Sequence, residues 1–122
     1  MKKIVMLNED LGTQMQIYLA LCDAYKVEIA ENVESAMYLL RKTKPEVLLL
    51  DYNLDQFTAN GKTGIDFIKK VKKKYTDLKV MMIMDNNDQV QIQEHGADEV
   101  LYKPIRNKNL ILNVKKLAGA TA

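Results

Sequence analysis

The chain has 122 residues, of which 48% are hydrophobic and 28% are charged, as in an ordinary globular protein. This length predicts a single domain over residues 1–122. The net charge of +2 is too small to indicate direct nucleic-acid binding, and no apolar run approaches the roughly 20 residues that cross a bilayer, so no membrane association is expected. The one cysteine, Cys22, cannot form an internal disulfide; interpreted as a buried thiol, it predicts a cytoplasmic protein.

The first half of the chain alternates short apolar runs with stretches of helical periodicity. Apolar runs at 4–7 and 27–30 predict two strands. Between them, apolar residues recur at three- and four-residue steps and predict a helix whose buried face is Leu11, Met15, Tyr18, Leu19 and Cys22. After the second strand, a helix capped by Asn32 is expected to bury Val33, Ala36, Met37 and Leu40.

The second half continues this alternation. Apolar runs at 47–50, 80–84 and 99–102 predict the remaining strands. An apolar stripe opposite a lysine-rich face predicts a third helix that buries Ile65, Ile68, Val71 and Tyr75. A helix is also expected at about 88–95, where Val90 and Ile92 are the only bulky apolar residues. The last helix is expected to bury Leu110, Ile111, Val114 and Leu117.

Strand–helix alternation of this kind predicts a doubly wound α/β fold with helices on both faces of a five-stranded parallel sheet. The runs at 4–7, 47–50 and 80–84 are apolar without alternation, which is typical of strands covered on both faces. In such sheets the working site lies beyond the carboxyl ends of the strands. Functional residues are therefore expected directly after Leu7, Leu50, Met84 and Tyr102.

Acidic residues and a lysine stand at these strand ends. Asn8-Glu9-Asp10 follows the first strand, Asp51-Tyr52-Asn53 follows the third, and Lys103-Pro104 follows the fifth. Magnesium prefers oxygen ligands and keeps several waters, so one or two carboxylates with a carbonyl suffice to bind it. A lysine can pair with phosphoryl oxygens as a mobile positive charge. These residue types suit a magnesium ion and a phosphoryl group.

The chain resembles the receiver domains of two-component response regulators over nearly its whole length. The motifs that carry the resemblance are the acidic cluster after the first strand, Leu49-Leu50-Asp51, Gly64-Ile65-Asp66-Phe67, and Gly96-Ala97-Asp98 leading to Lys103-Pro104-Ile105. The resemblance implies a flavodoxin-like fold with strand order 2-1-3-4-5 and a regulatory phosphoacceptor rather than an enzyme. It also implies a histidine kinase or phosphotransfer protein as donor, a downstream protein target, a bacterial cytoplasmic setting, and a monomer or weak homodimer.

The resemblance also assigns roles to individual residues. Asp51 corresponds to the phosphoacceptor, and Lys103 to the lysine that contacts the phosphoryl group, in a Lys–Pro peptide that is usually cis. Glu9 corresponds to the principal ligand of Mg²⁺, and the backbone carbonyl of Asn53 to another. Asp10 is a further candidate metal ligand, because it either compensates for Asn8 or forms the acidic pair with Glu9. The pair Asn8-Glu9 is favoured, since the other register places Asn8 at a normally apolar strand position.

The chain departs from the family pattern at several positions. Met84 stands where the family has a serine or threonine, and a thioether cannot donate a hydrogen bond to a phosphoryl group. Val100 stands at the position of the aromatic switch residue. The loop at 55–63 is longer than usual, and the fourth helix is shorter. These departures favour an alternative, a pseudo-receiver that acts as an interaction module independent of phosphorylation.

Simpler interpretations exist for the same residues. Asp51 alone is compatible with a turn, Lys103 with a solvated lysine before a turn proline, and Glu9 and Asp10 with capping of the first helix, where negative charge is favourable. Two enzyme classes fit poorly. A phosphatase with an aspartate nucleophile requires a second acid where this chain has Asn53, and a dinucleotide site requires more glycines than Gly12 after the first strand.

Overall fold

The computed structural model describes residues 1–55, 64–85 and 96–119. Strands and helices alternate along these residues, as the periodicity predicts. In chain order the elements are β1 (Lys3–Leu7), α1 (Leu11–Leu21), β2 (Lys26–Ala30), α2 (Val33–Thr43), β3 (Val47–Asp51), α4 (Gly64–Lys74), β4 (Lys79–Met84), β5 (Glu99–Tyr102) and α6 (Asn107–Leu117).

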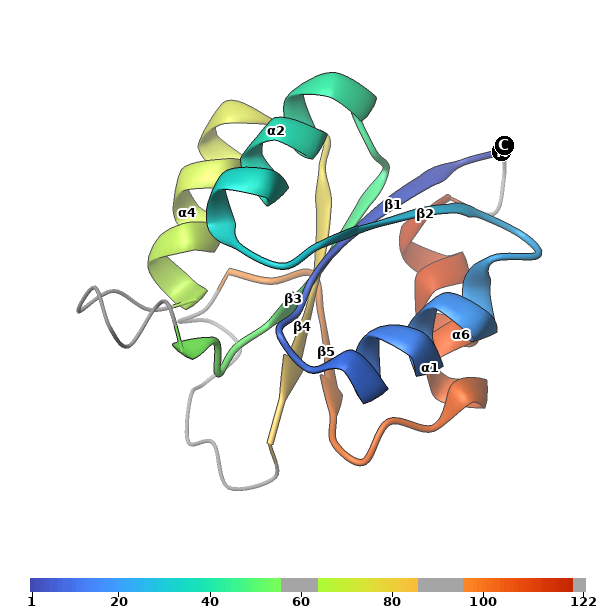
Figure 1. Cartoon of the computed structure of the whole chain (residues 1–122). Coiled ribbons are helices and arrows are strands. Elements are labelled where there is room, and N and C mark those ends of the chain that lie inside the picture. The colour runs from blue at the N-terminus through green and yellow to red at the C-terminus, as the bar shows by residue number, and fades with distance from the viewer. Residues whose placement is uncertain (56–63, 86–95, 120–122) are drawn as a thin grey trace.

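The strands form one parallel sheet in the order β2-β1-β3-β4-β5, which confirms the predicted fold. Figure 1 shows α1 and α6 on one face of this sheet and α2 and α4 on the other. Because all strands run in the same direction, the residues that follow β1, β3, β4 and β5 gather at one edge. The loop that begins at Asn8 lies beside the ends of β3 and β5 there.

The sheet separates two hydrophobic clusters, one under each pair of helices. Alternate residues of one strand belong to different clusters, as the period of two requires: Val5 packs with α2 and α4, and Met6 packs with α1 and α6. The described residues of β1, β3 and β4 are almost all fully buried, which explains why their sequences are apolar without alternation.

Most of the predicted helix faces are correct. Asn32 caps α2 through a reciprocal capping box with Ser35, and Ala36 and Leu40 are buried as expected. In α4 the buried residues are Gly64, Phe67, Ile68 and Val71, and in α6 they are Leu110 and Val114. Ile65, Tyr75 and Leu117, which were predicted to be buried, are only partly buried. The prediction that Ile111 is buried is wrong, because its side chain is 42% exposed.

The predicted buried face of α1 is wrong, although the helix itself is confirmed. The helix buries Gln14, Ile17 and Leu21 against the sheet, whereas Leu11 is 69% and Met15 45% exposed. The sequence of α1 contains no charged residue, so its apolar residues extend around more than one face and do not identify the inner one. Cys22, expected to be buried, is only partly buried.

Some predictions fall outside the described residues. The helix at 88–95 and the loop residues 56–63 are among them. Within the part of the chain that the structure describes, no helix has the length and apolar character needed to cross a membrane.

Candidate functional site

Asp51 is the last residue of β3, and only 5% of its surface is exposed. Both of its carboxylate oxygens accept hydrogen bonds. Oδ1 accepts from the backbone N–H of Asn53 at 2.9 Å, and Oδ2 accepts from Nδ2 of Asn8 at 3.2 Å and from Nζ of Lys103 at 2.9 Å. Three strand ends thus converge on one carboxylate, and the structure brings together Asp51 and Lys103 as the sequence predicts.

Lys103 is held in place by the backbone around it. Its N–H donates to the carbonyl of Met84 at the end of β4, and the Lys103–Pro104 peptide is cis, as expected. Partial burial by itself lowers the pKa of Lys103, but the hydrogen bond and charge of Asp51, with the charge of Asp85, outweigh it and raise the pKa above its ordinary value. Lys103 therefore stays a full positive charge beside the carboxylate.

Glu9 and Asp10 lie next to the site with different contacts. Oε1 of Glu9 accepts a hydrogen bond from the backbone N–H of Asp55 at 2.6 Å, which links the loop after β1 to the loop after β3. Asp10 is the N-cap of α1, and its Oδ2 accepts from the N–H and hydroxyl of Thr13. These two bonds lower the pKa of Asp10. In the structure Asp10 therefore acts as the N-cap of α1. Its role as a metal ligand stays a prediction.

Asn8 is fully buried at the end of β1. Its Oδ1 accepts from the N–H of Asp10 at 2.7 Å while its Nδ2 donates to Asp51, so the amide is oriented from both sides. The backbone carbonyl of Asn8 accepts from Nε2 of Gln14, a buried side chain of α1. The contact with Asp51 supports the register in which Asn8-Glu9 is the pair after β1.

Two residues of the site were not predicted from the sequence. Asp85 follows β4, where its Oδ2 accepts from Nδ2 of Asn53 at 2.9 Å and its Oδ1 lies 3.8 Å from Nζ of Lys103. Its position directly after Met84 was a signal, because that strand end was expected to carry functional residues. Gln14 gave no such signal, since nothing local marks a glutamine as buried.

The sequence and its fold were compared with known proteins. The model of the response regulator receiver domain family matches residues 5–115. The chain belongs to this family. It is 34% identical over 91 residues to the phosphate regulon transcriptional regulatory protein PhoB of Escherichia coli, an alignment that covers 70% of this chain and 38% of that regulator. The aligned segment thus spans well under half the length of this relative.

Solved receiver structures are similar over nearly their whole length. The N-terminal signal receiver domain of a Bacteroides fragilis response regulator is 28% identical with a TM-score of 0.86, covering 98% of both chains. A putative response regulator from Chloroflexus aurantiacus is 25% identical with a TM-score of 0.80, covering 96% of this chain and 97% of its own. These likenesses agree with the strand order of the sheet.

Local geometry explains the residues found in two of the sequence motifs of this receiver, at Gly64 and at Gly96-Ala97-Asp98. A Cβ added to Gly64 would lie 3.4 Å from the ring of Tyr52, so the start of α4 packs closely on the turn after Asp51. In Gly96-Ala97-Asp98, Gly96 adopts a positive φ of 72°, which glycine accommodates without strain. Oδ2 of Asp98 accepts from the N–H of Val80 and pairs with Lys72, and this fixes the start of β5 beside β4.

The two unusual switch positions of this receiver are apolar. Met84 is fully buried in the cluster beneath α2 and α4, and Val100 packs against the same cluster. Neither side chain can donate a hydrogen bond to a phosphoryl group. The structure thus shows an apolar side chain packed into the core at each of these two positions.

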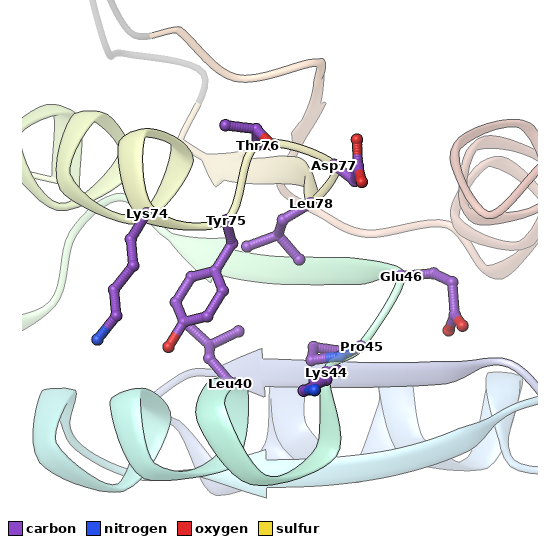
Figure 2. A pocket seen from close by; sticks show the side chains of 9 residues that line it. All are labelled: Leu40, Lys44, Pro45, Glu46, Lys74, Tyr75, Thr76, Asp77 and Leu78. Carbon is purple, nitrogen blue, oxygen red and sulfur yellow. The ribbon is translucent and has the colours of Figure 1, made fainter.

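A hollow of about 450 Å³ lies at the opposite end of the sheet from Asp51. It lies between the chain entering β3 and the chain entering β4, with Lys44, Pro45 and Leu78 among its walls (Figure 2). Tyr75 reaches from the end of α4 towards Leu40 of α2. The hydroxyl of Tyr75 is buried without a hydrogen-bond partner in the described structure. This hollow takes no part in the site at Asp51.

Proposed function

We propose that this receiver accepts a phosphoryl group on Asp51 from a histidine kinase or a phosphotransfer protein in the cytoplasm, and that it signals through contacts with a downstream protein. The observation that carries the proposal is the 2.9 Å contact between Nζ of Lys103 and a carboxylate that is almost fully buried. A buried aspartate held by a lysine from another strand end is positioned for reaction with an anionic group.

The residues around Asp51 have the chemistry that Mg²⁺ requires. Carboxylates of Glu9 and Asp51 and the backbone carbonyl of Asn53 are oxygen ligands, and magnesium needs few protein ligands because it retains water. Among the described residues, no group of three or more acidic, histidine or cysteine side chains is arranged around one point. We therefore propose a magnesium site of two carboxylates and one carbonyl, which would neutralise phosphoryl charge when the ion is bound.

The residues of the chain promote phosphoryl transfer mainly by holding the reacting groups in position. The phosphorus–nitrogen bond of a phosphohistidine breaks as a carboxylate oxygen of Asp51 bonds to phosphorus. Lys103 faces the developing negative charge on the phosphoryl oxygens, and the N–H of Asn53 holds the other oxygen of the carboxylate in place. The module is regulatory, because its product is its own phosphorylated form.

The test is phosphorylation by a small donor. The protein is incubated with Mg²⁺ and acetyl phosphate and examined by intact mass spectrometry, with Asp51→Asn as the matched control. One Mg²⁺-dependent phosphoryl adduct, absent from the control, is the expected result. An adduct that persists in Asp51→Asn would place the chemistry elsewhere, and no adduct in a folded protein would reject the proposal.

Two observations favour the alternative of a pseudo-receiver. Asn8 satisfies Asp51 by a hydrogen bond without any metal, and Met84 fills the core where a hydroxyl would respond to phosphorylation. In that case the protein binds its target equally well with and without a phosphoryl group. A Mg²⁺ titration followed by NMR separates the two, because a pseudo-receiver shows no saturable shift of the amides of Glu9, Asp51 and Asn53.

A further inference from the structure

Helix α1 exposes an apolar surface that the described residues of the chain leave uncovered. The exposed fractions are 69% for Leu11, 45% for Met15, 37% for Tyr18 and 65% for Leu19, and the helix has no charged residue. Single exposed apolar residues are ordinary, but contiguous ones on a helix mark an interaction surface. An uncharged helix surface of this kind is expected to be covered in the working state.

Three exposed residues of α1 and the partly buried Cys22 have the spacing of a helix-packing seam. Leu11, Met15, Tyr18 and Cys22 follow one another at steps of four, three and four residues, which places them along one side of α1. We call these four residues the α1 stripe. The spacing is symmetric about the midpoint between Met15 and Tyr18, so a second α1 running antiparallel would present the same sequence of steps. This symmetry is what a two-fold contact between identical subunits needs.

A hollow of about 550 Å³ adjoins the C-terminal end of the α1 stripe. Tyr18 and Cys22 from α1 line it together with Val27 from the edge strand β2. In an antiparallel pair of α1 helices, Leu11 of one copy lies opposite Cys22 of the other. Leu11, the most exposed residue of the stripe, would then enter a hollow with partly apolar walls.

Charges at the two ends of α1 are complementary in this arrangement. The exposed carboxylates of Glu9 and Asp10 directly precede Leu11. Lys3 and Lys26 line the hollow at the other end, and Glu28 also lines it, which leaves two positive charges against one negative charge. When Leu11 enters the hollow of a second copy, Glu9 and Asp10 therefore approach the lysines of that hollow. The two-fold symmetry repeats this contact at the other end of the paired helices.

We propose that two copies of this receiver associate through antiparallel packing of α1 on α1, with Leu11 of each copy seated against Tyr18 and Cys22 of the other. The contact is isologous, so the same stripe and the same hollow are used twice. Asp51 and Lys103 lie outside the stripe, whereas Glu9, which we propose as a magnesium ligand, lies at its acidic end. The dimer would place the two phosphoacceptor sites at opposite ends of the paired helices.

Disulfide trapping tests the geometry directly. Leu11→Cys creates one new thiol opposite the native Cys22 of the second copy, and mild oxidation is expected to give a crosslinked dimer on non-reducing gels. Leu112→Cys is the matched control, because Leu112 is 63% exposed on α6 and lies outside the stripe. Leu11→Cys combined with Cys22→Ser should lose the specific crosslink. Equal crosslinking of Leu11→Cys and Leu112→Cys would overturn the proposal.

Sedimentation velocity over a concentration series into the high-micromolar range tests the association without a crosslink. The unmodified protein is expected to dimerise, and Met15→Glu is expected to weaken the dimer at least about tenfold, because it buries a charge at the centre of the contact. Met15 is exposed in the monomer, so this substitution leaves folding intact, which circular dichroism verifies. A protein that stays monomeric throughout overturns the proposal.

Discussion

The side-chain amide of Asn8 donates a hydrogen bond to Oδ2 of Asp51 at 3.2 Å, and both residues are buried. The amide of Asn8 therefore satisfies part of the hydrogen-bonding capacity of the Asp51 carboxylate. The same oxygen also accepts from Lys103. The side chain of Asn8 is neutral, so it adds no negative charge to the magnesium site that we propose.

Asn8→Asp should change stability and metal affinity in opposite directions. Without metal, a second buried carboxylate beside Asp51 replaces a hydrogen bond with repulsion and should lower the free energy of unfolding by about 1–3 kcal/mol, measured by urea denaturation in EDTA. With metal, the added charge should increase Mg²⁺ affinity at least about tenfold, measured by isothermal titration calorimetry. Unchanged affinity would show that Asn8 does not limit metal binding.

Met84→Thr should restore a hydroxyl at the expense of packing. The side chain of Met84 is fully buried, so we expect a loss of about 2–3 kcal/mol in the free energy of unfolding. After phosphorylation, this variant should show amide shifts at β4 and β5 that the unmodified protein lacks, as followed by NMR. Met82→Thr is the matched control, because Met82 lies two residues earlier in β4 and faces the same cluster. This variant should lose stability without gaining the amide shifts.

Asp98→Asn should alter the acid dependence of stability. Burial by itself raises the pKa of Asp98, but hydrogen bonds from Lys72 and from the N–H of Val80, with the charges of Lys72 and Lys79, outweigh it and lower the pKa below its ordinary value. A carboxylate with a lowered pKa stabilises the fold above its unfolded pKa and loses that effect as pH falls through its folded pKa. The variant should be about 1 kcal/mol less stable at neutral pH, and thermal melts should converge with those of the unmodified protein in acid.

Tyr75→Phe should leave the protein equally stable or more stable. The hydroxyl of Tyr75 is buried without a hydrogen-bond partner in the described structure, and such a group costs about 1–3 kcal/mol. Removing the oxygen keeps the ring that packs against the cluster beneath α2 and α4. Chemical denaturation should show a gain of about 1 kcal/mol. A loss of stability would mean that the hydroxyl has a water partner in solution.

The parallel sheet and most helix faces could be predicted from the sequence because their signals are local. An uninterrupted apolar run such as 47–50 has few alternatives to a doubly covered strand, and Asn32 is recognisable as a cap from its neighbours. The buried face of α1 could not be predicted, because a helix without charged residues has no strongly polar side that identifies the solvent-facing surface. Only the tertiary contacts of Ile17 and Leu21 decide which side faces the sheet.

The candidate site was predictable where strand ends supply it, and less so where buried polar contacts complete it. Asp51 and Lys103 follow from their positions after two strands, and the structure confirms that they are in contact. The buried amide of Gln14 and the contact of Asp85 with Lys103 depend on side-chain orientation, which periodicity does not encode. The helix predicted at 88–95 lies outside the described residues and stays a prediction.

The sheet divides the interior of this receiver into two clusters, so the packing on one face of the sheet can change separately from the packing on the other. Met84 and Val100 pack with α2 and α4, whereas the exposed stripe belongs to a helix that packs on the other cluster. Substitutions more than about 7–10 Å apart with no shared partners have additive effects on stability. A substitution beneath α2 and α4 and a substitution in the exposed stripe are therefore expected to change stability independently of each other.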